Sequence, residues 1–195
     1  MSTEPAGGAV TYTFRPSLLG APWQFTLTGN AIEWRAGRQS GRTALDQVRF
    51  VRMSYRPANM QAHRFVTELW ADGAPKLRIV SASWKSMFEQ ERLDRPYSAF
   101  VAELHRRLAQ ADATPQFLRG TNPLIYWAGA AVFAAVVLGM LLLVVRALQS
   151  GSTAGALFIV VFIALFGWHG GNFVRRNTPG TYSADALPEM LLPKS

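Results

Sequence analysis

The sequence predicts an α+β protein, in which a domain of antiparallel strands and one helix precedes an all-α hairpin that crosses a membrane. Two observations predict the hairpin: Ile125–Val145 contains twenty-one consecutive uncharged residues, and a second apolar stretch covers Ala154–Trp168. A third observation predicts the domain, because short runs of alternating apolar and polar residues begin at Trp23 and lead to one amphipathic helical pattern. The 195 residues suffice for one modest domain and the hairpin.

The strand pattern follows a short amino-terminal segment, residues 1–11, which is small and polar and is expected to be disordered. Apolar residues then alternate with polar ones over Trp23–Trp34, with Thr28-Gly29-Asn30 as a turn, and this predicts a β-hairpin. Arg35–Arg42 is a second turn-rich segment. Further strands are expected at Val48–Tyr55, His63–Trp70 and Lys76–Ser81. Strands spaced by roughly ten to fifteen residues predict an antiparallel sheet.

One amphipathic helix is expected to close this domain, which we place at residues 12–112. Its apolar residues recur at helical spacing on one face: Tyr97, Phe100, Val101, Leu104 and Leu108. Asp94 and Pro96 are suitable residues for its first turn. A sheet with one apolar face needs a cover, and this helix can provide it.

The hairpin is expected after a linker at residues 113–123, with membrane-spanning helices at residues 124–148 and 154–174. A helix of about twenty residues spans roughly 30 Å, the thickness of the hydrocarbon core of a bilayer. The alternative is a buried helical pair in a soluble protein. It is disfavoured because the helices of soluble proteins normally carry a polar face, and these stretches carry none.

Charged and aromatic flanks predict how the hairpin is oriented. Arg119 precedes the first span, and Arg175 and Arg176 follow the second, whereas the turn between the spans has only Arg146 nearby. Because Lys and Arg concentrate on the cytoplasmic side, both termini and the tail at residues 175–195 are expected to be cytoplasmic. The rings expected at this same interface are Tyr126, Trp127 and Trp168.

Small residues within the spans are candidates for close helix packing. They form two patterns with a spacing of four residues: Ala135 with Gly139, and Gly167 with Gly171. Packing inside the hairpin and packing between protomers are both consistent with these patterns, so an oligomer is possible.

Three segments of the domain resemble the bacterial form of the pleckstrin-homology (PH) superfold. They are the hairpin Trp23–Trp34, the segment Leu45–Pro57 and the helical segment Tyr97–Leu108. The resemblance covers roughly residues 12–110. It implies a PH-like, partly open antiparallel β-barrel of seven strands capped by one carboxy-terminal helix. Bacterial domains of this type are often joined to membrane helices, which agrees with the hairpin.

The resemblance also directs attention to basic residues, because eukaryotic relatives often bind phosphoinositides beside the first loop between strands. Here that loop is expected at Thr28-Gly29-Asn30, which contains no Lys or Arg. The nearest basic residues are Arg35, Arg38 and Arg42. They are candidates for contact with anionic lipid, where each charge near the surface adds about 1 kcal/mol. The alternative is an ordinary solvated loop.

The sequence does not predict catalysis. It contains no cysteine, which excludes thiolate chemistry and disulfides. No phosphate-binding loop, zinc-protease motif or hydrolase nucleophile motif occurs, so no catalytic, cofactor-binding or metal-binding residue is expected. An acidic group at Glu89, Glu91 and Asp94 is expected to pair with Arg92 and Arg95 rather than to hold a metal. Arg64-Phe65 and similar pairs fit the two faces of a strand, so no nucleic-acid partner is expected.

Together these features predict a non-catalytic, membrane-anchored binding or scaffolding module. Its expected location is the bacterial inner membrane, with two spans and no cofactor. The net charge is +8, and residues 1–119 contain sixteen basic and ten acidic residues, a balance of +6. Such a domain is attracted to anionic lipid, so the expected partners are membrane lipid and another protein. The alternative function is an accessory subunit of a larger membrane complex, docked through the hairpin.

Overall fold

The computed structural model describes residues 8–56, 64–86, 89–111 and 114–193, apart from the side chains of His169 and Phe173. The chain divides into two compact units. The first, the sheet unit, consists of Met1–Gly120 together with Gly180–Ser195. The second, the helical unit, consists of Thr121–Pro179. The N-terminal segment expected to be disordered lies outside the described residues as far as residue 7.

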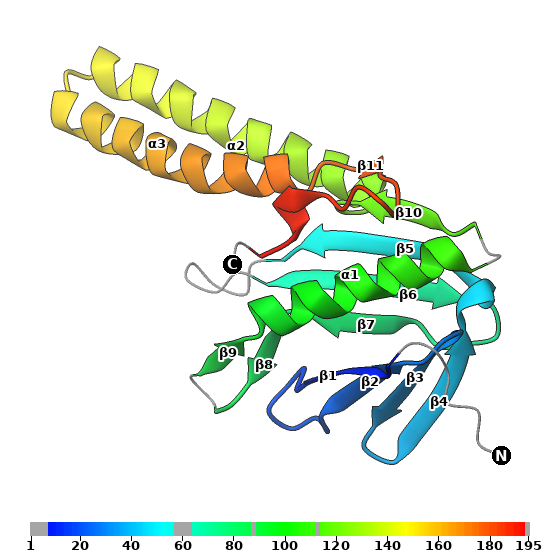
Figure 1. Ribbon diagram of the computed structural model, residues 1–195. Coiled ribbons are helices and arrows are strands. Elements are labelled where there is room, and N and C mark those ends of the chain that lie inside the picture. The colour runs from blue at the N-terminus through cyan, green and yellow to red at the C-terminus, as the bar shows by residue number, and fades with distance from the viewer. Residues whose placement is uncertain (1–7, 57–63, 87–88, 112–113, 194–195) are drawn as a thin grey trace, which may run out of the picture. The chain divides into compact units, whose positions relative to one another are not determined.

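The first sheet is an antiparallel meander of four strands in chain order (Figure 1). The strands are β1 (Val10–Phe14), β2 (Trp23–Leu27), β3 (Ala31–Ala36) and β4 (Gln39–Ala44). The hairpin predicted for Trp23–Trp34 is confirmed, because β2 and β3 pair across the turn at residues 28–30. Alternation places Phe25 and Leu27 in the core, while Gln24 and Thr26 lie on the other face.

Two features of this sheet differ from the sequence prediction. β1 includes Val10 and Thr11, so the expectation of disorder as far as residue 11 is wrong for these two residues. The strand pattern was not recognised, although Val10, Tyr12 and Phe14 alternate with threonines. The turn-rich segment Arg35–Arg42 forms the facing ends of β3 and β4, joined at Gly37 and Arg38. Gly37 has a φ of 61°, which a two-residue hairpin turn requires and which glycine adopts without strain.

The second sheet has the strand order β11-β10-β5-β6-β7. The antiparallel part is formed by β5 (Val48–Tyr55), β6 (Phe65–Ala71) and β7 (Leu77–Val80), close to the predicted strands. Two later strands extend its other edge: β10 (Gln116–Arg119), which runs parallel to β5, and β11 (Gly180–Thr181), which is antiparallel to β10. A separate pair is formed by β8 (Ala82–Trp84) and β9 (Gln90–Arg92).

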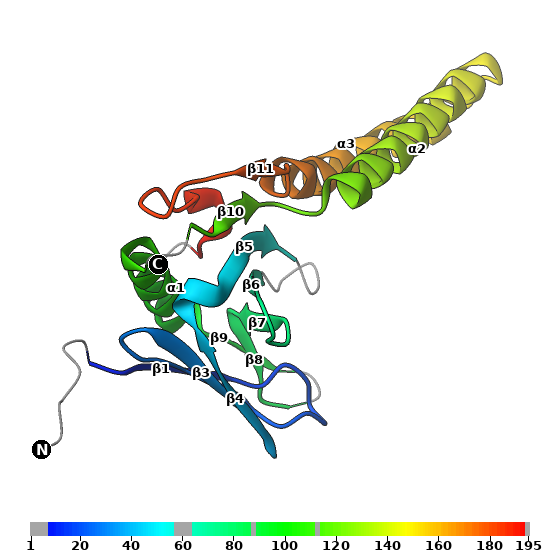
Figure 2. The ribbon, with the colours of Figure 1, turned by 90° about the vertical axis from the view of Figure 1, so that its right-hand side faces the viewer.

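The domain is therefore mixed α+β, as predicted. In place of the expected PH-like, partly open β-barrel, the described strands lie in several sheets. The strands form three separate sheets, and within the described residues β4 does not pair with β5. A short 3-10 turn at Leu45–Gln47 redirects the chain between these two strands, so the ladder does not continue from one sheet to the next. In Figure 2 the two large sheets form separate layers.

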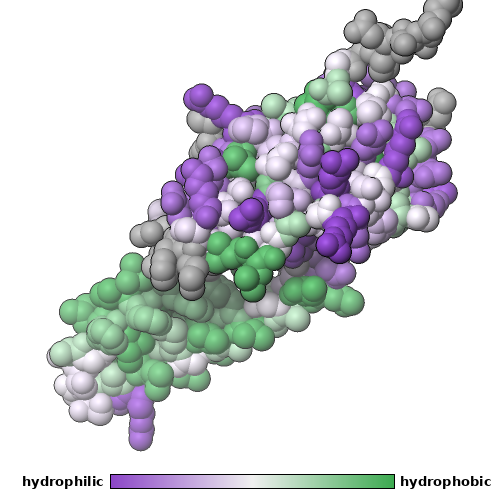
Figure 3. Space-filling view, turned by 90° about the horizontal axis from the view of Figure 1, so that it is seen from below, coloured by the Kyte–Doolittle hydropathy of each residue, from purple (hydrophilic) through white to green (hydrophobic). Residues whose placement is uncertain are grey.

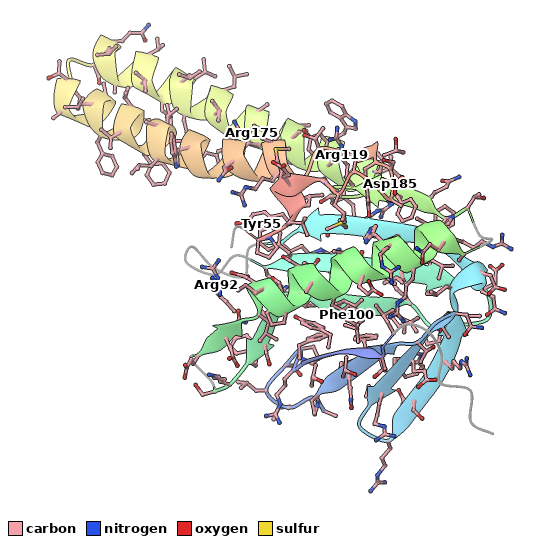
Figure 4. All side chains as sticks on the ribbon, in the orientation of Figure 1. Tyr55, Arg92, Phe100, Arg119, Arg175 and Asp185 are labelled. Atoms are coloured by element: carbon pink, nitrogen blue, oxygen red, sulfur yellow. The ribbon has the colours of Figure 1, made fainter. Side chains whose placement is uncertain are left out.

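Helix α1 (Asp94–Gln110) lies along one side of the space between these layers (Figure 2). All five residues of the predicted apolar face are buried: Tyr97, Phe100, Val101, Leu104 and Leu108. The ring of Phe100, labelled in Figure 4, is 5.5 Å from that of Tyr12 on β1. The Tyr97 hydroxyl lies 2.7 Å from the Thr67 hydroxyl on β6. The core thus joins α1 to both sheets.

The helical unit consists of α2 (Pro123–Gln149) and α3 (Thr153–Arg176), which pack together as a hairpin. Asn122 caps α2 by accepting a hydrogen bond from the Leu124 N–H, and Gly151 with a φ of 75° forms the turn. The most apolar segments of the two helices have mean hydropathies of 2.7 and 1.9 and are not buried. Both helices are long and apolar enough to cross a membrane, and Figure 3 shows their surface as largely hydrophobic.

The helical unit is inserted between two paired strands of the sheet unit. β10 lies within the segment expected to be a linker, and β11 lies within the tail. Arg119 faces Gly180 in the β10–β11 register, so the chain leaves the sheet unit and returns to it at neighbouring points. After β11, Tyr182, Leu187 and Leu192 pack against the core of the sheet unit, and Leu191 is buried in it.

A buried histidine connects the tail to α1. His105 Nδ1 lies 2.7 Å from the Val101 carbonyl oxygen, which can only accept, so Nδ1 carries the proton. His105 Nε2 then accepts from the Tyr182 hydroxyl, also at 2.7 Å. Burial lowers the pKa of His105 to about 4, because the charged imidazolium would lose its hydration there.

We expect the sheet unit to lose stability as the pH falls from about 6.5 to about 4. In this range the unfolded histidine binds a proton that the folded one excludes, so the free energy of unfolding decreases by about 3 kcal/mol and this contribution is constant below pH 4. Denaturant unfolding at pH 7.5, 5.5 and 4.5 measures the effect. His105→Gln is the matched control and should remove this part of the slope. Equal slopes in both proteins would contradict the prediction.

Candidate binding site

The basic residues expected to contact lipid lie on the β3–β4 hairpin and are exposed. Arg35 and Arg42 share the outer face of the first sheet, whereas Arg38 lies in the turn. Arg42 is 3.9 Å from Glu33 and donates a hydrogen bond to the Asn30 side chain. The face is shallow and its positive charge is partly balanced. The hairpin therefore has the features of a solvated surface as much as those of a lipid contact.

A better-defined candidate site is a cavity of about 240 Å³ at one end of the sheet unit. Its walls combine aromatic rings with two arginines. The lining residues are Phe14, Pro16, Trp23, Arg64, Arg78, Val80, Ala82, Trp84 and Gln90. The sequence analysis did not predict this site.

Its aromatic wall is positioned by strand register. Phe14 and Trp23 face each other where β1 and β2 are joined, so both side chains lie on the inner side of the first sheet. The Trp23 ring stacks on the rings of Phe25 and Trp34, with centroids 5.7 and 5.9 Å apart. The backbone N–H of Trp84 donates to the Arg15 carbonyl, which holds β8 beside the end of β1.

The two arginines lie on one side of the second sheet, with Arg64 immediately before β6 and Arg78 on β7. Arg78 and Val80 are two residues apart on β7, and Val80 faces Val66, two residues beyond Arg64. Burial lowers the pKa of both arginine side chains, and the positive charges of Arg78 and Arg56 lower that of Arg64 further. The cavity is therefore an electropositive site that is partly removed from water.

A carboxylate beside this face, that of Glu68, is already paired. Glu68 faces Arg78 in the β6–β7 register and is buried. Its two oxygens lie 2.8 Å from Lys76 Nζ and 3.5 Å from Arg56. Its attraction is the smallest of the three influences on the pKa of Arg78. Lys76 and Arg56 are thus the ion-pair partners of Glu68, and its carboxylate does little to neutralise Arg78.

Unused hydrogen-bonding groups concentrate around the cavity. Among the described residues, six buried side-chain polar atoms have no hydrogen-bond partner. Three of them belong to residues that line this cavity: Arg64 Nε, Arg78 Nε and Gln90 Oε1. Such groups are costly when unsatisfied, so their concentration here makes the cavity a candidate site for a polar ligand group.

Sequence reasoning identified the alternation of Arg64 and Phe65 but not its consequence. Phe65 is buried on the opposite face, against Tyr55, as the strand period predicts. The face that carries Arg64 meets aromatic residues from the first sheet, about forty or more positions earlier in the chain. The period of a strand gives the direction of a side chain but not what lies across from it.

The acidic group before α1 behaves as an ion-pair group. Arg92 contacts Asp94 at 2.5 Å, and Lys85 contacts Glu91 at 3.6 Å. Within the part of the chain that the structure describes, no cluster of His, Asp and Glu side chains could hold a metal ion.

The residues expected at the membrane interface lie near the ends of the helical unit. The Tyr126 and Trp127 rings are in edge-to-face contact near the start of α2, and Trp168, Arg175 and Arg176 lie near the end of α3.

Close helix packing occurs at Gly170, against Phe133, which the sequence analysis did not select. At the predicted Gly139, Gly167 and Gly171, an added Cβ would meet no described atom within 4 Å. Ala135, the fourth predicted packing position, lies on α2.

No family model matches this chain, and neither a curated protein nor a solved structure was found to be similar to it.

Proposed function

We propose that the protein is a non-catalytic, membrane-anchored binding module that presents its sheet unit at the cytoplasmic face of the bacterial inner membrane. The exposed apolar surface of α2 and α3 carries this proposal. Leu124 and Phe158, for example, are 82% and 72% exposed. Exposing apolar surface to water costs roughly 25 cal/mol per Å², so these helices require an apolar surrounding, which a bilayer provides.

The insertion of the helical unit supports a hairpin whose two ends lie on one side of the membrane. Because Arg119 and Gly180 pair, both connections to the helical unit begin at one place in the sheet unit. Arg119, Arg175 and Arg176 lie at this end, whereas the turn at the other end has only Arg146. The excess of positive charge favours the cytoplasm for the sheet unit and the tail.

Single cysteines test this orientation, and the chain contains no native cysteine to interfere. We expect an impermeant thiol reagent to label Ser150→Cys in cells whose outer membrane is permeable to it, because Ser150 lies in the exposed turn. The exposed tail position Ser183→Cys should react only after lysis. Labelling of Ser183→Cys before lysis would overturn the orientation, and complete extraction of the protein by alkaline carbonate would overturn the anchor.

The resemblance to PH-like domains belongs to the same proposal. Two antiparallel groups of strands, β1–β4 and β5–β7, precede α1 and support the resemblance, while the additional pair β8–β9 lies between them and the helix in the sequence. The helix also covers one side of both groups, as a PH-like helix would. The proposal does not include a closed barrel.

A second candidate function is that of an accessory subunit docked through the hairpin. The observation that favours it is the open space beside Gly139, Gly167 and Gly171. These positions would allow the backbone of another helix to approach closely. Replacing them with leucine should then release a partner during purification in mild detergent, while leaving the membrane location unchanged.

A further inference from the structure

We propose that the cavity between the first sheet and the β7–β8 segment binds a small organic oxyanion, in which a carboxylate or phosphate group is attached to an aromatic body. The inference rests on the proposed function and names the ligand class of that binding module. It is carried by the juxtaposition of two half-buried arginines with three aromatic rings.

The anionic group follows from the polar side of the cavity. Arg64 and Arg78 each retain a buried Nε–H without a partner, and their positive charges repel each other. An oxyanion with two oxygens can accept one hydrogen bond from each guanidinium and relieve this repulsion. Charge-assisted hydrogen bonds of this kind are stronger than neutral ones, and guanidinium geometry matches carboxylate and phosphate.

Gln90 supplies a neutral polar group on the same wall. Its Oε1 is buried without a partner, and the amide can present either oxygen or nitrogen after rotation. No carboxylate lines the cavity among the described residues, so a cation has no countercharge there. A negatively charged ligand therefore fits this wall and a positively charged one does not.

The aromatic body follows from the opposite wall. Phe14, Trp23 and Trp84 present flat apolar surfaces, and Trp23 is held by stacking on its neighbours. Rings of this kind contact a flat apolar group in offset or edge-to-face geometry and add favourable energy beyond burial. A free inorganic anion would leave this wall without a partner.

The size of the cavity limits the ligand to a small molecule. Its volume of about 240 Å³ is below the 300–1,000 Å³ that is typical of sites for drug-sized ligands. It corresponds to about eight water molecules at roughly 30 Å³ each. A single ring with its anionic group fits this space, whereas a long acyl chain or a folded peptide segment does not.

Calorimetric titration of the full chain in non-ionic detergent tests the inference. The probes are benzoate and phenyl phosphate, with benzamide as the uncharged analogue and inorganic phosphate as the anion alone. We expect benzoate or phenyl phosphate to bind at least about tenfold more tightly than both controls, since each lost charged contact weakens binding by that order. The stronger of the two identifies the preferred anion.

Variants then place the binding in this cavity. Arg64→Lys and Arg78→Lys keep the charge but lose the Nε donor, and each should weaken binding about tenfold or more. Arg49→Lys is the matched control, because Arg49 is exposed and pairs with Asp72 elsewhere on the surface. Ala82→Leu fills the cavity and should abolish binding without altering charge. If the lysine variants do not fold, the loss of binding in Ala82→Leu places the ligand in the cavity instead.

Three results would overturn the inference: no binding of either aromatic anion, equal binding of benzoate and benzamide, or unchanged binding in the Arg64, Arg78 and Ala82 variants. Inorganic phosphate binding as tightly as phenyl phosphate would also overturn it, because the aromatic wall would then have no role. The orientation of the anchor is tested separately by cysteine labelling. If the chain binds benzoate but Ser183→Cys is labelled in intact cells, the proposed ligand site stands and the proposed orientation is wrong.

Discussion

Replacing Gly120–Pro179 with the dipeptide Asn-Gly is expected to turn the protein into a soluble, folded domain. Arg119 and Gly180 face each other in the antiparallel β10–β11 register, so a two-residue turn can connect them directly. Asn-Gly is the preferred sequence for such a turn, because both residues adopt positive φ. The replacement removes both apolar helices and leaves every strand of the two large sheets in place.

The expected result is a complete shift of the protein from the membrane fraction to the soluble fraction, with cooperative unfolding in denaturant. Fractionation by centrifugation and tryptophan fluorescence measure the two effects. A chain that ends at residue 111 is the informative control. It lacks β10, β11 and the buried Leu191, so it should unfold at a lower denaturant concentration. Aggregation of the Asn-Gly variant would show that the sheet unit needs the helices to fold.

The features that the sequence predicted well are those with a strong local period. The apolar residues of α1 recur at helical spacing over about three turns. In β5, eight residues long, Val and aromatic residues are interspersed with arginines. The two apolar helices are defined by length and composition alone. In each of these segments, neighbouring residues contain enough information to specify the element.

The features that it missed depend on distant partners. β11 has only two residues, and it becomes a strand because β10, about sixty residues earlier, lies beside it. β10 itself is parallel to β5, a pairing that needs a long connection and leaves no hairpin signal in the sequence. β1 is the exception, since its alternation of Val10, Tyr12 and Phe14 with threonines is visible in the sequence.

The candidate site shows the same limit. The group of Arg35, Arg38 and Arg42 was found because these residues are close in the sequence, and the structure places them on a shallow, partly neutralised surface. Arg64 immediately precedes β6 and Arg78 lies on the adjacent strand β7, but the rings that complete the cavity come from β1, β2 and β8. Only the packing of one sheet against another brings these chemical groups together.

The second large effect is expected from Leu104→Ala, which should lower the free energy of unfolding of the sheet unit by roughly 2–5 kcal/mol. Leu104 is 0% exposed and lies at the centre of the buried face of α1, between Val101 and Leu108. The truncation removes the transfer energy of its methyl and methylene groups and leaves a cavity that the two surrounding sheets cannot fully close. Denaturant unfolding monitored by tryptophan fluorescence measures the loss.

Two further variants separate packing from helix propensity. Leu104→Met preserves the volume of the side chain and should cost less than about 1.5 kcal/mol. Gln110→Ala changes an exposed residue of the same helix and should stay within about 0.5 kcal/mol of the unaltered chain. If Leu104→Ala behaved like Gln110→Ala, α1 would not be the element that joins the two sheets.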